Sequence, residues 1–205
     1  MGIPVMILGE SGTGKSASLR NFESGEVAII NVVGKPLPFK TKLSTYNSDD
    51  YTKVMSAIYR SVNELGYTRV VVDDSQYLMA NEFMRRAYEK GYDKFTEIAS
   101  NYHGLISMVQ KLPNNVIVYF LSHVAVDERG KERCKTIGKM LDEKITIEGL
   151  FTIVLKTEVK DGNYYFSTRN SGNDTVKSPI GMFDSELIDN DLKMVDETIR
   201  QYYEL

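Results

Sequence analysis

Residues 1–16, MGIPVMILGESGTGKS, join an apolar run to a glycine-rich turn that ends in a lysine and a serine. Residues 3–8 predict a buried strand, and the residues after Ser16 can continue as a helix. Between them, residues 9–16 match the spacing GxxxxGK(S/T) at every position. A strand, this turn and a helix in succession predict an α/β fold with the turn at the carboxyl edge of a parallel sheet.

The turn has the composition of a phosphate-binding loop. Its backbone must wrap a phosphate closely enough for successive N–H groups to point inward, and glycine adopts the required dihedral angles at low cost. Lys15 would neutralise the β- and γ-phosphates of a nucleotide, and the Ser16 hydroxyl would be one ligand of Mg²⁺. The alternative is an ordinary turn before a helix. The candidate phosphate-binding residues are Gly9, Glu10, Ser11, Gly12, Thr13, Gly14, Lys15 and Ser16.

A second motif lies at residues 68–74, TRVVVDD, where a short hydrophobic strand ends in two carboxylates. A buried parallel strand that ends in Asp places this carboxylate at the same sheet edge as the glycine-rich turn. We therefore expect Asp73 to bind Mg²⁺ directly or through one of its ligands, and Asp74 to orient or deprotonate an attacking water. Without the phosphate loop, the same residues would indicate only a strand that runs into a turn.

Residues 116–121, VIVYFL, predict another buried strand, and Ser122 and His123 follow it. His123 would then lie at the carboxyl edge beside the two motifs. Its ring can hydrogen-bond a terminal phosphate and change its contacts when that phosphate leaves. The alternative is a polar residue that caps a loop.

The next stretch, residues 126–139, is predicted to be a flexible basic loop. Next to a phosphate sensor, such a loop is suited to bind a nucleic-acid strand when nucleotide is present. As a charge run alone, it would indicate only a solvated loop. The candidate DNA-binding residues are Arg129, Lys131, Arg133, Lys135 and Lys139.

The remaining segments complete the expected order of elements. They are a strand at 26–31, a proline-containing loop at 34–42, helices over 51–65 and over 75–112 with a break near Gly91, a hairpin of 151–160 and 163–169 about Asp161-Gly162, and a docking helix over about 191–203. Arg169 and Lys177 border a mobile segment, and cations there can complete a neighbouring subunit's site, although most such cations are only solvated.

Length and charge narrow the classes of protein. The 205 residues fit one domain, spanning 1–205, and the net charge of −3 argues against a protein that coats nucleic acid by bulk charge. The single cysteine excludes an internal disulfide, and one Cys with two His cannot form a structural zinc site, which suits a reducing cytoplasm. No apolar stretch approaches a membrane span, so we expect no membrane partner.

The chain resembles the bacteriophage RecA-like P-loop ATPases of the single-strand annealing type. The resemblance rests on five stretches: GESGTGKS, VVVDDSQYL, FLSHVAVDERG, KTIGKML and VKSPIGMF. The resemblance implies a RecA-like core with a mostly parallel sheet flanked by helices, and hydrolysis of ATP with Mg²⁺. It also implies single-stranded DNA as a ligand and homo-oligomeric rings or filaments. Partner proteins of phage recombination or replication in the host cytoplasm are implied as well. By position, His123 matches the polar sensor of these enzymes, and Arg169 and Lys177 match their trans-acting cations.

The chain departs from this pattern in one respect. Many RecA-like enzymes carry a catalytic Glu just after the second strand, but residues 29–39, IINVVGKPLPF, contain no acid. Asp74 is the nearest substitute as general base, and we expect its neighbour Asp73 to raise the pKa of Asp74 unless Mg²⁺ is bound.

Two other functions remain open from the sequence. One is a nucleotide or small-molecule kinase, which also joins a phosphate loop to a short α/β domain. Such an enzyme would need a lid of paired helices over the phosphates. The candidate lid here, residues 126–139, is followed by a β-hairpin instead. An accessory ATPase or helicase loader would bind a partner protein through the last helix.

Overall fold

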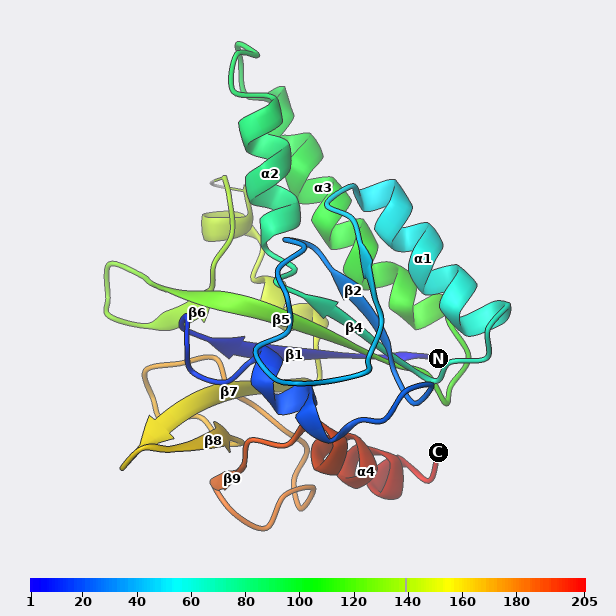
Figure 1. Ribbon diagram of the computed structural model, residues 1–205. Helices are drawn as coiled ribbons and strands as arrows, with labels where there is room; N and C mark the ends of the chain where they lie inside the picture. The colour runs from blue at the N-terminus through cyan, green and yellow to red at the C-terminus, as the bar shows by residue number, and fades with distance from the viewer. Residues whose placement is uncertain (139) are drawn as a thin grey trace.

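The computed structural model of the chain describes residues 1–138 and 140–205, and it forms an α/β fold around one mostly parallel sheet (Figure 1). The strands are β1 (Ile3–Gly9), β2 (Ala28–Asn31), β3 (Thr45–Asn47), β4 (Arg69–Asp73), β5 (Ile117–Val126), β6 (Glu132–Cys134), β7 (Ile153–Lys160), β8 (Asn163–Ser167) and β9 (Leu187–Asp189). The sheet order is β3-β2-β4-β5-β1-β7-β8-β9, and β6 pairs with the end of β5. The neighbouring strands β3, β2, β4, β5, β1 and β7 run parallel to one another. Strand β8 is antiparallel to both β7 and β9.

Helices cover both faces of this sheet (Figure 1). The helices are α1 (Tyr51–Asn63), α2 (Tyr77–Arg85), α3 (Asp93–Met108) and α4 (Leu192–Tyr203), with the short 3-10 helices η1 (Ser16–Asn21), η2 (Val109–Lys111) and η4 (Ile147–Leu150) and the π-helical turn η3 (Met140–Lys144). Helices α1, α2 and α3 lie on one face, and α4 and η1 lie on the other.

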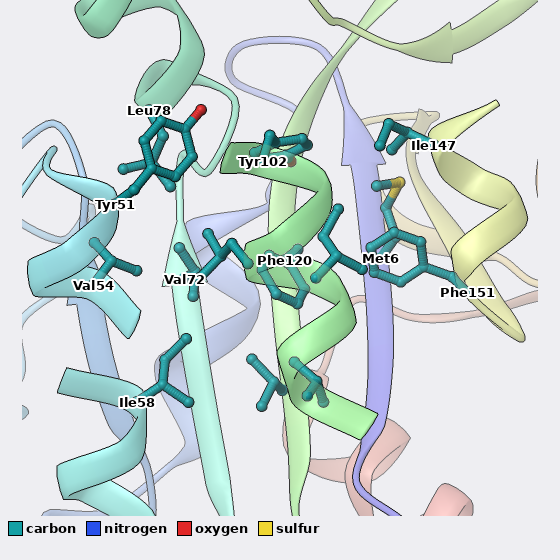
Figure 2. Close-up of a cluster of buried hydrophobic side chains, with 14 of the residues drawn as sticks. Met6, Tyr51, Val54, Ile58, Val72, Leu78, Tyr102, Phe120, Ile147 and Phe151 are labelled. Atoms are coloured by element: carbon teal, nitrogen blue, oxygen red, sulfur yellow. The ribbon is translucent and has the colours of Figure 1, made fainter. Parts of the chain in front are cut away.

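The two faces are built by the alternation of side chains along the strands. Met6 on β1 contributes to the core under α1 and α3, whereas Val5 and Ile7 contribute to the core under α4 and η1. Figure 2 shows the first of these cores, in which Met6 and Phe120 from the strands gather with residues of α1 and α3. The central strands are hydrophobic on both faces because each face is covered by a helix.

Most of the expected elements are confirmed. The helical stretch 75–112 is indeed broken around Gly91, which has a φ of 93° and separates α2 from α3. The turn between β7 and β8 is Asp161-Gly162, with φ values of 52° and 76°, as the hairpin signal predicts. Asp191 caps α4 and accepts hydrogen bonds from the backbone N–H groups of Lys193 and Met194.

Two expectations need correction. The helix after the glycine-rich turn is only the six-residue 3-10 helix η1, which ends where Phe22 becomes extended. The expected basic loop of residues 126–139 is, over its described residues 126–138, not simply a flexible loop, because β5 continues through Val126 and pairs with β6 in a hairpin. Backbone partners on β6 therefore extend a strand that side-chain pattern alone would end at Leu121. Among the described residues, no helix is long and apolar enough to span a membrane.

Helix α4 is fixed to the sheet by a buried acid. The Asp196 side chain is 0% exposed and accepts hydrogen bonds from Tyr119 Oη at 2.8 Å and from Arg200 Nε at 2.7 Å. Arg69 at the start of β4 donates to the same carboxylate. Two guanidinium groups and a phenol hydroxyl thus donate hydrogen bonds to the carboxylate. These bonds offset the cost of removing its charge from water.

We expect Asp196→Ala to destabilise the protein by about 3 kcal/mol, because it removes the acceptor of the buried Tyr119 hydroxyl and the charge partner of two partly buried guanidinium groups. Glu197→Ala, one residue away on the exposed face of α4, is the matched control and should change stability by less than about 0.5 kcal/mol. Chemical denaturation of both variants measures the difference. Equal stabilities would show that the Asp196 network does not hold α4 in place.

Candidate functional site

The sequence-predicted motifs meet at the carboxyl edge of the sheet. Gly9 at the end of β1 pairs in register with His123 on β5, and β5 lies between β1 and β4. Asp73 ends β4 on the other side of β5. The inserted strand therefore places His123 between the glycine-rich turn and the two carboxylates.

The turn itself depends on two glycines. Gly12 and Gly14 have φ values of 81° and 102°, which other residues adopt only with strain. At Gly14 a Cβ would also lie 3.0 Å from Asn190 Oδ1 and 3.1 Å from Tyr164 Cδ1. Glycine is thus needed here both for the left-handed backbone and for the close approach of the segments that precede α4 and form β8.

Lys15 lies at the centre of the site. Its buried ammonium donates to the carbonyl oxygens of Gly9 at 2.8 Å and of Glu10 at 2.7 Å. Burial lowers its pKa to about 8, although the nearby Asp74 and Asp73 carboxylates oppose this shift. A lysine ammonium carries three N–H donors, so two carbonyl acceptors leave one donor for a further acceptor such as a phosphate oxygen.

Ser16 and Asp73 form the candidate metal pair. Ser16 Oγ donates a hydrogen bond to Asp73 Oδ1 at 2.9 Å, which joins the glycine-rich turn to β4. Burial, and then the adjacent Asp74, raise the pKa of Asp73 to about 6. A hydroxyl and a carboxylate fit Mg²⁺, because this ion usually takes few protein oxygens and completes its shell with waters and phosphates.

Asp74 carries the opposite shift. Burial favours its neutral form, but the hydrogen bond and charge of His123, together with Lys15 and Lys35, outweigh burial and lower its pKa. His123 Nε2 lies 3.4 Å from Asp74 Oδ1. The expectation that Asp73 raises the pKa of Asp74 is therefore wrong. Of the two carboxyl groups, the more deeply buried Asp73 has the raised pKa, and the lowered pKa of Asp74 favours its ionised form.

The positions of several pocket residues were not predicted from the sequence. The pocket at this sheet edge, which contains the candidate phosphate-binding residues, has a volume of about 490 Å³. It is lined by the glycine-rich turn, both carboxylates and His123, and also by Asn31, Lys35, Pro36, Pro38 and Tyr164. The prolines of the 34–42 loop indicated an irregular segment, but not that it would reach this pocket. Gln76 was also missed, and its side-chain oxygen accepts from the His123 backbone N–H at 3.2 Å.

A second cavity of about 550 Å³ adjoins the first, since Ala17 and Tyr164 line both. Asn190 in its wall is 1% exposed, and its side-chain nitrogen has no hydrogen-bond partner among the described residues. Arg20 Nη1 donates to the Asn190 carbonyl at 2.5 Å. The second cavity thus has the exposed Tyr164 ring in its wall and a buried, unpartnered amide nitrogen behind it, next to the first pocket.

The candidate DNA-binding residues gather on the β5–β6 hairpin, and Lys139 lies outside the described residues. Asp127 organises the hairpin turn: its side chain accepts from the backbone N–H groups of Arg129 and Lys131, both at 2.9 Å, and pairs with Arg133 at 3.0 Å. The Lys135 backbone N–H donates to the His123 carbonyl at 2.8 Å. The pairing of the two hairpin arms therefore extends back to His123, which lines the pocket.

Arg169 and Lys177 are not part of the phosphate pocket of their own chain. Arg169 is half-exposed and donates to the Phe183 carbonyl at 3.4 Å. Lys177 pairs through its backbone with Val154 on β7, and its side chain is exposed. Both cations are at the surface, and a role in a neighbouring subunit stays a prediction.

No protein-family model matches the chain, and no curated protein matches it at a significant level. The assignment of a function therefore rests on the chemistry of the site.

The pKa of Asp73 predicts that the metal-free protein gains stability when this charge is removed. The folded-state pKa of about 6 lies above the ordinary value of 3.8, so the stability contributed by Asp73 is present at low pH and lost as the pH rises through 6. We expect Asp73→Asn to match the wild type near pH 4 and to be more stable by about 3 kcal/mol at pH 7, at 1.36 kcal/mol per pKa unit.

Denaturation in the presence of a chelator, repeated across this pH range, measures the effect. Asp184→Asn at an exposed position is the control and should show no such dependence on pH. A variant less stable than the wild type at pH 7 would contradict the prediction.

Proposed function

We propose that the chain is a Mg²⁺-dependent ATPase of the RecA-like P-loop class that binds single-stranded DNA. The observation that carries the proposal is the Ser16–Asp73 hydrogen bond of 2.9 Å beside the buried Lys15 ammonium. A hydroxyl, a carboxylate and a cation meet there at the end of a glycine-rich turn, which is the combination that a magnesium-bound triphosphate requires.

Each residue has a role in the proposed reaction. Lys15 and the turn N–H groups would hold the β- and γ-phosphates, and Ser16 and Asp73 would hold Mg²⁺, which would neutralise charge on the phosphates. Asp74 orients a water and accepts its proton as the water oxygen bonds to the γ-phosphorus and the bond to the β–γ bridging oxygen breaks. His123 steadies the Asp74 carboxylate, and ADP and phosphate are the products.

The strand order supports a RecA-like core. With β5 inserted between β1 and β4, the strand that carries the candidate sensor His123 passes between the phosphate loop and the acidic pair. The residue can then contact a terminal phosphate directly. The sugar and base of ATP would extend past Ala17 into the second cavity, where the Tyr164 ring offers a stacking surface.

The basic hairpin supports a link between nucleotide and DNA. His123 and the hairpin lie on one continuous strand, and the Lys135–His123 backbone bond closes the base of the hairpin. A contact between His123 and a terminal phosphate would therefore shift the backbone that positions Arg133 and Lys135. Hydrolysis would release both the phosphate and the DNA.

The same hairpin favours hydrolysis over phosphoryl transfer to a small acceptor. A kinase would need a lid of paired helices after β5, and the described residues there form antiparallel strands instead. We further propose homo-oligomers, rings or filaments, in which Arg169 and Lys177 approach a neighbour's site. The setting that the resemblance implies is phage recombination or replication in the host cytoplasm.

Lys15→Ala should reduce ATP turnover by at least about 100-fold, because it removes the buried cation that faces the phosphates. Release of free phosphate from ATP measures this, with Lys90→Ala at an exposed position as control. If the wild type transfers phosphate to a nucleoside monophosphate instead of releasing it, the kinase alternative holds. If it does not bind ATP with Mg²⁺, the proposed function is wrong.

The double variant Arg133→Ala, Lys135→Ala should bind single-stranded DNA more weakly and with a shallower dependence on salt. Each lost phosphate contact reduces the slope of log K against log salt by about 0.7 for a single strand. Fluorescence anisotropy with an oligonucleotide at several salt concentrations measures both quantities. Lys53→Ala with Lys111→Ala removes the same charge elsewhere and should leave binding unchanged, whereas equal losses would point to bulk charge alone.

A further inference from the structure

The loop after β2 brings a second lysine to the phosphate site. Asn31 ends β2 in register with Asp73 and is 3% exposed. Its side-chain nitrogen donates to the Lys35 carbonyl at 2.6 Å, and its oxygen accepts from the Gly34 N–H at 2.7 Å. Gly34 has a φ of 76°, which suits the tight turn. One buried carboxamide thus fixes the path of residues 31–35 at the mouth of the pocket.

The Lys35 side chain is exposed but held near the site. Its Nζ lies 5.9 Å from the centroid of the Tyr77 ring, a cation–π distance, and Lys35 lines the same pocket as Lys15, Asp74 and His123. Pro36 and Pro38 also line this pocket and restrict the backbone that follows Lys35. The charge of Lys35 acts on both Lys15 and Asp74, in each case lowering the pKa.

The negative charge expected in the nucleotide-bound pocket exceeds what Lys15 alone can neutralise. A terminal phosphate group carries about two negative charges at neutral pH, and the Asp74 carboxylate stands nearby. Lys15 is the cation of the glycine-rich turn, and its charge is already opposed by burial. A further ammonium on a separate loop would offset the repulsion between Asp74 and the terminal phosphate.

We propose that Lys35 contacts the γ-phosphate of a bound nucleoside triphosphate and supplies charge stabilisation from the same chain, in addition to the cations of a neighbouring subunit. This inference rests on the proposed function. The position after β2 would then hold a cation in place of the acid that many RecA-like enzymes have there, and Asp74 would remain the base. Since ADP lacks the γ-phosphate, Lys35 would distinguish the triphosphate from the diphosphate.

Calorimetry tests this with the wild type, Lys35→Ala, Lys35→Arg and, as the control, Lys42→Ala, an exposed lysine farther along the same loop. Each protein is titrated with a non-hydrolysable ATP analogue and with ADP, both with Mg²⁺. We expect Lys35→Ala to lose about 10-fold in affinity for the analogue and less than about 2-fold for ADP, which corresponds to about 1.4 kcal/mol for the one contact. Lys35→Arg should retain most of the affinity, and Lys42→Ala all of it.

Equal losses for both nucleotides, or no loss for either, would overturn the role of Lys35 and leave the proposed function standing. Absence of binding by the wild type would instead overturn the proposed function, and the Lys35 inference with it. Misfolding is not expected, because Asn31 bonds the Lys35 backbone and not its side chain. Unchanged thermal denaturation of Lys35→Ala verifies this.

Mixing two impaired variants decides whether Lys35 acts within its own chain. Lys15→Ala and Lys35→Ala are combined in equal amounts and assayed for phosphate release at an ATP concentration low enough that the weaker triphosphate binding of Lys35→Ala limits its turnover. If Lys35 acts on its own chain's nucleotide, neither subunit can form a complete site, and the mixture should be no more active than its components. Recovery of activity would show that Lys35 acts across a subunit contact and would overturn the inference.

Discussion

The site depends on a carboxylate held where water would solvate it better. Asp73 is 4% exposed at the end of β4, and burial together with Asp74 raises its pKa to about 6, so its charged form is costly at neutral pH. The Ser16 hydroxyl offsets part of this cost and ties the glycine-rich turn to β4. A divalent cation would offset the remainder. The feature that weakens the metal-free fold is thus the one that would favour binding of the proposed Mg²⁺.

Strand β5 connects the candidate site to the basic hairpin formed by β5 and β6. It lies between β1 and β4, contributes His123 to the candidate site, and then continues for three residues into the basic hairpin. Its central residues are fully buried, so it cannot shift without disturbing both cores. Movement at the site is therefore easier at the hairpin, where Val126 is exposed, than within the sheet.

Local signals could be read from the sequence, and non-local ones could not. The glycine-rich turn, the acidic end of β4 and the Asp161-Gly162 hairpin are each encoded by adjacent residues, and the structure has all three. Strands β3, β6 and β9 have three residues each and form only where a neighbouring strand offers backbone partners. Lys35 reaches the pocket through hydrogen bonds of the Asn31 side chain, and the ordering of the two Asp pKa values depends on depth and on His123. None of these features can be predicted from the spacing of residues along the sequence.

The backbone at Asp74 explains how two consecutive acids serve one pocket. Side chains alternate along a strand, so Asp73 and Asp74 would point to opposite faces if β4 continued. Asp74 instead has a φ of 58°, a left-handed conformation that costs a non-glycine residue of the order of 1 to 3 kcal/mol. The change of direction lets both carboxylates line the pocket, one bonded to Ser16 and the other close to His123. Glycine at this position would relieve the strain but would lack the carboxylate, so the strain persists where the proposed chemistry needs two acids side by side.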